Sequence, residues 1–129
     1  MTATRIYNAS CHCGSVRFNF RSEEITNGRR CNCSICVRKG AVMSSVYFPP
    51  ENIQDFEGRV SLNLYQFGDK HVEHHFCNQC GICPFHVIAG VPETYDGPAK
   101  PGYYRINLGC VHGLDVFALD VDVIDGKSF

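Results

Sequence analysis

Residues 10–14 read SCHCG and residues 77–81 read CNQCG, and these two short motifs decide how the chain can fold. In the second motif the backbone must turn sharply for both sulfurs to face one ion, and the glycine that follows permits this turn at little steric cost. The first motif can offer two further sulfurs from nearby backbone. Four thiolates around zinc form a closed tetrahedral site of the structural type. The spacing therefore predicts a first metal cluster that ties the N-terminal region to the middle of the chain, with the ligands Cys11, Cys13, Cys77 and Cys80.

Residues 31–36 read CNCSIC and place three more sulfurs within one short segment, Cys31, Cys33 and Cys36. Three protein ligands leave zinc a fourth position for water or substrate, which is typical of a catalytic site. In the alternative, a fourth ligand (Cys83, Cys110 or a histidine) closes a second structural site. We favour the open site and keep the closed one as its competitor.

The cysteine content indicates metal binding rather than disulfide bonds. The chain has 9 cysteines, an odd number, and most of them fall in C-x-C or C-x-x-C groups. Secreted disulfide scaffolds usually carry an even number behind a signal peptide. The first ten residues, MTATRIYNAS, lack the apolar run of such a peptide, and no segment is apolar over the roughly 18 residues that span a membrane. We therefore expect a cytoplasmic protein with no membrane partner.

Length and charge restrict the class of protein further. A chain of 129 residues fits a single domain, which we predict to span residues 1–129. The chain has 12 Lys and Arg and 13 Asp and Glu, a formal net charge of −1, with no basic stripe or block. A nucleic-acid partner would require such a basic surface, so we expect none.

Apolar residues alternate with polar ones in several short stretches, which predicts a mainly β fold. The expected strands cover residues 16–20, 60–64, 72–76, 104–110 and 116–123, the last with both faces partly covered. One short helix is expected from Ser34, as its cap, to Lys39, with Gly40 ending it. Residues 91–102 are rich in proline and read as a surface loop.

Four further groups of residues stand outside the two predicted clusters. Cys83 is expected to be a buried small residue or a substitute ligand, and Cys110 a packed free thiol. A strand places His74 and His75 on opposite faces, so with His71 they cannot all converge on one metal, although one of them could reach the open site. Cations flank the second motif and could offset its thiolates and hold a substrate carboxylate, namely Arg29, Arg30, Arg38 and Lys39.

Taken together, four segments resemble one known family in order and spacing. They are SCHCGSVRF, CNCSICVRKG, HHFCNQCGICPF and the closing NLGCVHGLDVFALDVDVIDGKSF. The family is the CENP-V/GFA domain, named for centromere protein V and the glutathione-dependent formaldehyde-activating enzyme. The resemblance covers nearly the whole chain, from about Cys11 to Lys127. Cys83 departs from the pattern, because a cysteine is not expected there.

The resemblance implies a fold, two zinc ions and a reaction. The fold would be a zinc-stabilised β-tent of short antiparallel strands. Cys11, Cys13, Cys77 and Cys80 match the family's structural zinc ligands, and Cys31, Cys33 and Cys36 match the ligands of its second zinc, the one linked to glutathione. The implied activity is that of a carbon–sulfur lyase, S-(hydroxymethyl)glutathione synthase, or of an enzyme acting on a related thiol adduct.

Two other functions remain as alternatives. A methionine sulfoxide reductase of the B type also uses paired C-x-x-C zinc ligands, and there Cys110 would be the redox nucleophile. A zinc-stabilised binding module without catalysis is the non-enzymatic alternative. The residue patterns name no general base and no oligomeric state.

Overall fold

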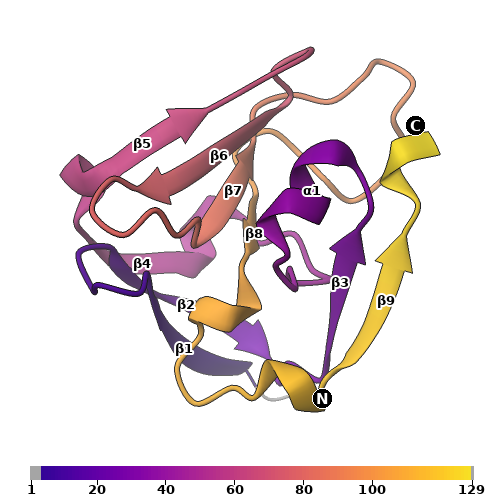
Figure 1. Cartoon of the computed structure of the whole chain (residues 1–129). Coiled ribbons are helices and arrows are strands. Elements are labelled where there is room, and N and C mark those ends of the chain that lie inside the picture. The colour runs from indigo at the N-terminus through magenta and orange to yellow at the C-terminus, as the bar shows by residue number, and fades with distance from the viewer. Residues whose placement is uncertain (1–3, 129) are drawn as a thin grey trace.

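The computed structural model describes residues 4–128 and has a mainly β fold (Figure 1). One antiparallel sheet has the strand order β1-β2-β4, a second has the order β5-β6-β7-β8, and β3 pairs with β9. The strands are β1 (Thr4–Ser10), β2 (Arg17–Glu23), β3 (Asn27–Cys31), β4 (Ile53–Glu57), β5 (Leu62–Tyr65), β6 (Val72–Cys77), β7 (Phe85–Ile88), β8 (Tyr104–Ile106) and β9 (Asp120–Ile124). The mainly β class and the β-tent of short strands are confirmed. Residues 1–3 and 129 of the predicted single domain lie outside the described residues, and the domain assignment stays a prediction.

The core lies between the two antiparallel sheets and is built from aromatic side chains. Phe18 and Phe20 alternate along β2 and are 3% and 0% exposed, as their period-2 spacing predicts. From the other sheet, Phe85 meets Phe18 edge to face, with ring centroids 5.6 Å apart. Such edge-to-face contacts align the positive ring edge with the negative ring face, so they favour one relative placement of the sheets.

The pairing of β3 with β9 is an exception to the expected antiparallel pattern, which the other two sheets follow. These strands are parallel, with Asn27 opposite Asp120 and Cys31 opposite Ile124. A parallel pair needs a long crossover connection, and here most of the sequence separates the two strands along the chain. The sequence pattern cannot reveal such a distant partner.

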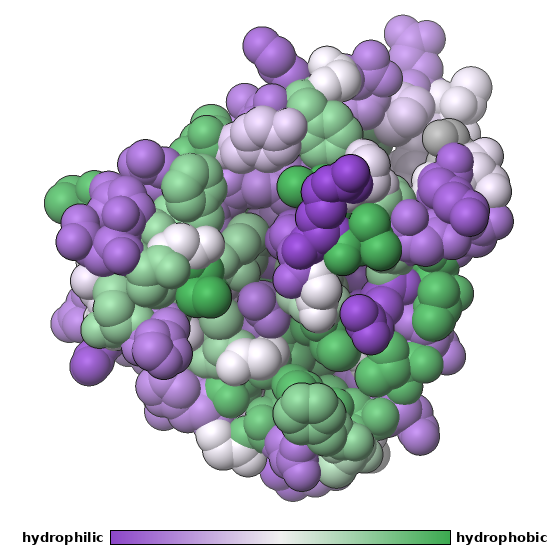
Figure 2. Space-filling model, in the orientation of Figure 1, coloured by the Kyte–Doolittle hydropathy of each residue, from purple (hydrophilic) through white to green (hydrophobic). Residues whose placement is uncertain are grey.

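The expected covered strand at residues 116–123 is also wrong. Val116–Ala118 form a 3-10 turn, and β9 begins only at Asp120. Phe117 is 95% exposed and Val123 is 72% exposed, so apolar side chains here do not mark a core. Figure 2 shows hydrophobic residues gathered on the side of the molecule where Figure 1 places β3 and β9.

Two other expected strands are shorter than their patterns predict. Before β5, Gly58 adopts a left-handed conformation (φ 88°) and starts a 3-10 turn over Arg59–Ser61, which leaves Val60 91% exposed. After β8, the Asn107 side chain accepts a hydrogen bond from the Gly109 amide and so starts another 3-10 turn. In both places a local turn overrides the apolar alternation.

The helix α1 (Ser34–Lys39) lies where a helix was predicted and ends at Gly40, whose φ is 65°. Cys33 rather than Ser34 occupies the N-cap position, so the cap residue was predicted one position too late. Within residues 4–128, no helix has the length and apolar character needed to cross a bilayer. Residues 91–102 form a mostly exposed loop, as predicted.

Candidate metal centres

The four cysteines predicted to form the first cluster come together from the segment after β1 and from the end of β6 with the turn that follows it. The sulfurs of Cys11, Cys13, Cys77 and Cys80 all lie within 4.8 Å of one another. The Cys11–Cys13 and Cys13–Cys77 sulfur distances are both 3.7 Å. Sulfurs placed about 2.3 Å from a zinc ion at the corners of a tetrahedron are about 3.8 Å apart. The donor set and its spacing therefore fit zinc.

Local backbone geometry turns these sulfurs toward one another. Cys77 ends β6, and its carbonyl accepts a hydrogen bond of 2.8 Å from the Gly81 amide, which closes the turn. Gly81 has φ 80°, the left-handed conformation that its place in the motif predicts. Cys11 and Cys77 are buried against Val16, so the cluster is anchored in an apolar layer.

The thiols of this cluster differ in acidity. Burial raises the pKa of Cys11 to about 11. Burial acts in the same direction on Cys80, but hydrogen bonds from the backbone of Cys13 and Ile82 overcome it and lower the pKa of Cys80 to about 6. Hydrogen bonds with Ser15 also lower the pKa of Cys13. A cluster with such acidic thiols can bind a metal ion there first and then release the remaining protons, as thiolate sites do.

The second cluster contains three sulfurs. Those of Cys31, Cys33 and Cys36 lie within 4.8 Å of one another, and within residues 4–128 no further Cys, His, Asp or Glu atom joins them at that spacing. We call this set the three-cysteine site. Cys31 ends β3, Cys33 is the N-cap of α1, and Cys36 lies in its first turn. The predicted open arrangement fits the geometry better than a closed fourth-ligand site.

The C-terminal segment packs against the three-cysteine site and forms hydrogen bonds with the loop that carries its sulfurs. The Asn32 side chain donates to Asp125 at 2.8 Å and accepts from the Lys127 amide at 3.0 Å. A methyl group added at Gly126 would lie 2.2 Å from the Cys31 sulfur, so a larger residue there would displace the sulfur or the backbone. Segments distant in the sequence thus hold the loop that carries the sulfurs.

Hydrogen bonds set the acidity of this cluster as well. Burial acts to raise the pKa of the Cys33 thiol, but hydrogen bonds from the backbone of Cys36 and Ile35 and from neighbouring thiols lower it overall. Burial raises the pKa of Cys36 to about 12, against the opposing positive charge of Lys39. Cys33 is therefore the thiol of this pair that ionises first.

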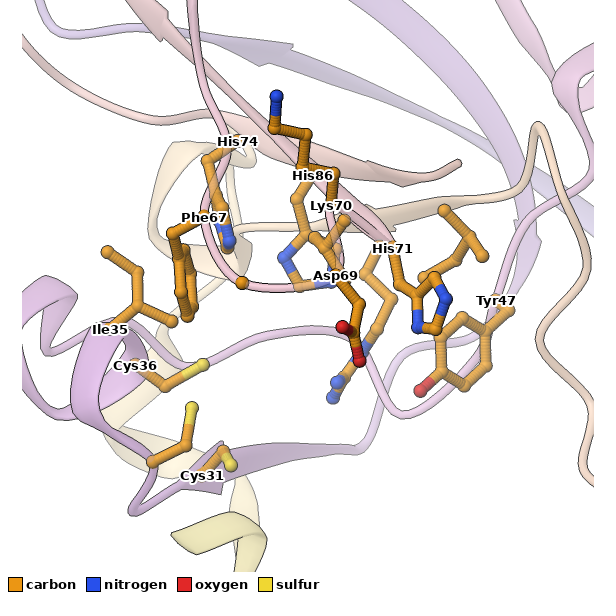
Figure 3. A pocket seen from close by; sticks show the side chains of 15 residues that line it. Cys31, Ile35, Cys36, Tyr47, Phe67, Asp69, Lys70, His71, His74 and His86 are labelled. Carbon is orange, nitrogen blue, oxygen red and sulfur yellow. The ribbon is translucent and has the colours of Figure 1, made fainter. Parts of the chain in front are cut away.

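A cavity of about 340 Å³ opens beside the three-cysteine site. Its other walls come from the face of the β6-β7-β8 sheet and from the loop between β5 and β6 (Figure 3). Ile35 and Phe67 lie near Cys36 at one end, whereas His71 and Tyr47 lie at the other (Figure 3). A small organic molecule could therefore reach the sulfurs from this cavity.

Three nitrogen-bearing side chains form a row across the sheet beneath the cavity. His74 on β6 is directly opposite His86 on β7, which is directly opposite Arg105 on β8. All three line the cavity and are only 5%, 5% and 7% exposed. Burial lowers the pKa of His74 to about 4, and burial together with nearby cations holds the pKa of His86 well below its usual range. Both imidazoles are therefore neutral near pH 7.

The histidines predicted from the sequence separate as expected. His74 faces the cavity, and so does His71, whereas His75 stacks on Phe85 of the core at 5.3 Å. His75 also pairs with Glu73 at 3.3 Å. Consistent with the prediction, the three do not converge on one metal.

Other predicted residues lie elsewhere. None of the four cations flanking the second motif lines the cavity, and Arg38 instead donates to the Ser34 carbonyl at 2.8 Å. Cys83 belongs to neither cluster and its thiol contacts the Phe85 carbonyl at 3.3 Å. Cys110 is buried, as predicted for a packed thiol, although it lies in a 3-10 turn rather than a strand.

Sequence reasoning missed His86, Arg105 and Tyr47 as cavity residues. A weak signal exists for two of them. Val87 and Ile88 mark a short strand that contains His86, and Arg105 stands between the apolar residues Tyr104 and Ile106. A polar residue inside an apolar strand is informative because it needs a partner when buried. Tyr47 carries no comparable signal.

The fold and the two cysteine clusters define a class of mainly β proteins with two candidate metal centres, one closed and one open to a cavity. The family model described as glutathione-dependent formaldehyde-activating enzyme matches residues 6–121, and the chain belongs to this family. The crystal structure of a Rhodobacter sphaeroides protein is similar to the structure of this chain, with a TM-score of 0.69 and 27% sequence identity. That match covers 89% of this chain and 99% of the other.

Proposed function

We propose that this protein is a zinc-dependent carbon–sulfur lyase that joins glutathione, or a related thiol, to formaldehyde and releases them again. One observation carries the proposal: three cysteine sulfurs, which no fourth ligand atom from residues 4–128 joins, border a cavity of about 340 Å³. Family membership supports the same two reactants, because the family model is described as glutathione-dependent formaldehyde-activating enzyme. Two zinc ions are proposed, one on Cys11, Cys13, Cys77 and Cys80 and one on the three-cysteine site.

The chemistry requires a thiolate, an aldehyde and a proton donor for the oxygen of the product. A zinc ion held by Cys31, Cys33 and Cys36 would, when bound, favour the deprotonated form of a thiol that enters its open position. The carbon–sulfur bond forms as the carbonyl π bond breaks, and the proton lost by the thiol ends on the new hydroxyl oxygen. The reverse reaction releases the aldehyde.

The residues of the cavity contribute position and hydrogen bonds. The walls hold the two reactants together and so convert a bimolecular step into a local one. His74 accepts a hydrogen bond from the Lys39 ammonium at its Nδ1 atom (3.4 Å), because an ammonium can only donate. Its proton therefore sits on Nε2, where it can be donated to an oxygen in the cavity.

The methionine sulfoxide reductase alternative is disfavoured by the environment of Cys110. That thiol is 8% exposed, does not line the cavity, and has a pKa raised to about 12 by burial. A redox nucleophile needs an accessible thiolate. The cytoplasmic location and the non-catalytic binding module stay predictions.

The test is a measurement of adduct formation together with zinc content. The rate of conversion of ¹³C-formaldehyde and glutathione would be followed by NMR for the wild-type protein, Cys33→Ser and Cys83→Ser. We expect two zinc ions per chain and an accelerated rate for wild type and for Cys83→Ser, whose thiol belongs to neither cluster. Cys33→Ser should lose one zinc ion and the acceleration. A wild-type rate equal to the spontaneous rate, with two zinc ions bound, would favour the binding module instead.

A further inference from the structure

The row of His74, His86 and Arg105 carries a buried positive charge that has no anionic partner in the described part of the chain. Arg105 is 7% exposed, and within residues 4–128 no carboxylate lies within 4.0 Å of its guanidinium group. A buried charge is costly unless it is paired. The Arg105 side chain is nevertheless held firmly, because its Nε atom donates to the Ser44 carbonyl at 3.0 Å and its guanidinium lies 5.2 Å from the Tyr47 ring. The two terminal nitrogens remain available to a ligand.

His86 supplies a second polar group in the same row that lacks a partner among the described residues. Its Nδ1 atom is buried and has no hydrogen-bond partner among the described residues. Buried polar atoms in folded proteins are nearly always hydrogen-bonded, so an orphan of this kind calls for an explanation. His86 lies between Arg105 and His74 in the row, directly in the cavity wall.

The positive charge of Arg105 could instead serve only to balance the thiolates of the three-cysteine site. The cation that does so is Lys39, which opposes the raised pKa of Cys36. The charge of Arg105 acts on His86. The acidic residue that lines the cavity is Asp69, which is exposed on the loop before β6 and makes no ion pair with Arg105. An anion from outside the chain is thus the simplest partner.

We propose that the His74–His86–Arg105 row is a carboxylate-binding subsite, which fixes the carboxylate of a substrate while its reacting end lies at the three-cysteine site. The planar fork of an arginine side chain matches the two oxygens of a carboxylate, and neutral imidazoles can donate N–H groups to the same oxygens. The inference deepens the proposed function, on which its reactive end rests, but carboxylate binding itself does not require the reaction.

The carboxylate can belong to either reactant. Glutathione-type thiols carry carboxylates, and so does a carbonyl compound of the oxo-acid class. Formaldehyde has none and would leave Arg105 unpaired unless the thiol supplied the group. The experiment therefore uses one matched pair of probes for each source.

The test is isothermal titration of the zinc-loaded protein with four small molecules. The thiol pair is 3-mercaptopropionate and 3-mercaptopropanol, and the carbonyl pair is glyoxylate and glycolaldehyde. We expect the carboxylate-bearing member of at least one pair to bind roughly 10-fold or more tightly than its neutral partner, as charge-assisted bidentate bonds allow. A preference in the thiol pair alone assigns the subsite to the thiol substrate, and a preference in the carbonyl pair alone assigns it to the carbonyl substrate. Equal binding within both pairs would overturn the proposal.

Variants of cavity residues show which side chain causes the preference for carboxylate-bearing probes. Arg105→Gln should reduce it to about 2-fold or less, and Arg105→Lys, which keeps the charge but not the fork, should reduce it only in part. Lys70→Gln, a cation on the cavity rim, is the matched control and should keep the preference. Asp69→Asn should keep or strengthen it, because a competing carboxylate is removed. Zinc content and the unfolding midpoint, measured for each variant, identify any that fail to fold.

The outcomes separate this proposal from the reaction. A preference for carboxylates that persists in Arg105→Gln would place the carboxylate on the metal or elsewhere and refute the subsite. A preference that depends on Arg105, in a protein that does not accelerate adduct formation, would support the subsite and refute the lyase. Accelerated formaldehyde turnover without any carboxylate preference would support the lyase and refute the subsite.

Discussion

Substitution of Gly126 by alanine should damage the three-cysteine site and leave the first cluster intact. The added methyl carbon would lie 2.2 Å from the Cys31 sulfur and 3.4 Å from the Cys33 Cβ atom. Non-bonded heavy atoms settle at roughly 3.5–4 Å, so the sulfur or the backbone must move by roughly 1.3 Å or more. Metal sites tolerate deviations of only about 0.2 Å in their ligand distances.

We therefore expect zinc affinity at the three-cysteine site to fall by about 100-fold or more, which corresponds to about 2.7 kcal/mol. Movement of the backbone is restricted, because Asn32 bonds to Asp125 and to the Lys127 amide on either side of the glycine. Competition titration with a coloured zinc chelator would resolve the two sites. Cobalt substitution would report the number of sulfur ligands through the sulfur-to-cobalt absorption.

The matched control is Lys127→Ala, which keeps the backbone amide that bonds to Asn32 and removes only an exposed side chain. This variant should bind two zinc ions with wild-type affinity. Unchanged second-site affinity in Gly126→Ala would refute the close approach of Gly126 to Cys31. Equal loss at both sites would indicate general unfolding rather than a local displacement.

Three further predictions concern the first cluster, the core and pH. Cys77→Ser should abolish zinc binding at the first cluster and unfold much of the protein, seen as loss of the β signal in circular dichroism, because structural zinc supplies folding energy. Phe85→Ala, at a side chain 1% exposed, should lower the free energy of unfolding by about 3–5 kcal/mol in urea titration. The pKa of His74 is lowered to about 4, so the unfolded chain takes up the proton first as pH falls below about 6.5. Its contribution to stability should drop by about 2 kcal/mol between pH 7.5 and 5; a pH dependence no smaller in His74→Gln than in wild type would contradict this.

The cysteine chemistry of the fold was readable from the sequence because it depends on local spacing. A C-x-x-C turn with glycine at its end has few alternative geometries, and the observed φ of Gly81 is the one its position requires. Cys11 and Cys13 were grouped with Cys77 and Cys80 because a structural zinc site takes four ligands, not because the sequence shows that the two pairs are in contact. The helix after the second motif was likewise predictable from neighbouring residues alone.

The cavity was not readable because its parts are brought together by strand register. His74, His86 and Arg105 become neighbours only once β6, β7 and β8 are aligned, and a slip of one residue would turn them to the other face. The strands β1, β3, β4 and β7 were also not foreseen. The apolar residues of β1, β3 and β4 are few or interrupted by charge, as in Asn27–Cys31, where tertiary pairing outweighs weak local preference. The strand β7 is mostly apolar but has only 4 residues.

The support of Cys31 by Gly126 has a consequence for the order of events during synthesis. The last ligand of the first cluster, Cys80, leaves the ribosome well before Gly126 does. At about 5–20 residues per second the interval is on the order of several seconds. Throughout that time the growing chain carries the complete set of ligands for the first cluster. It also carries the thiols of Cys31, Cys33 and Cys36, against which residues 125–127 have not yet packed. A nascent chain should therefore acquire its two metal ions in sequence, and oxidants or competing metals would find the second trio at its most vulnerable before the final strand is laid down beside β3.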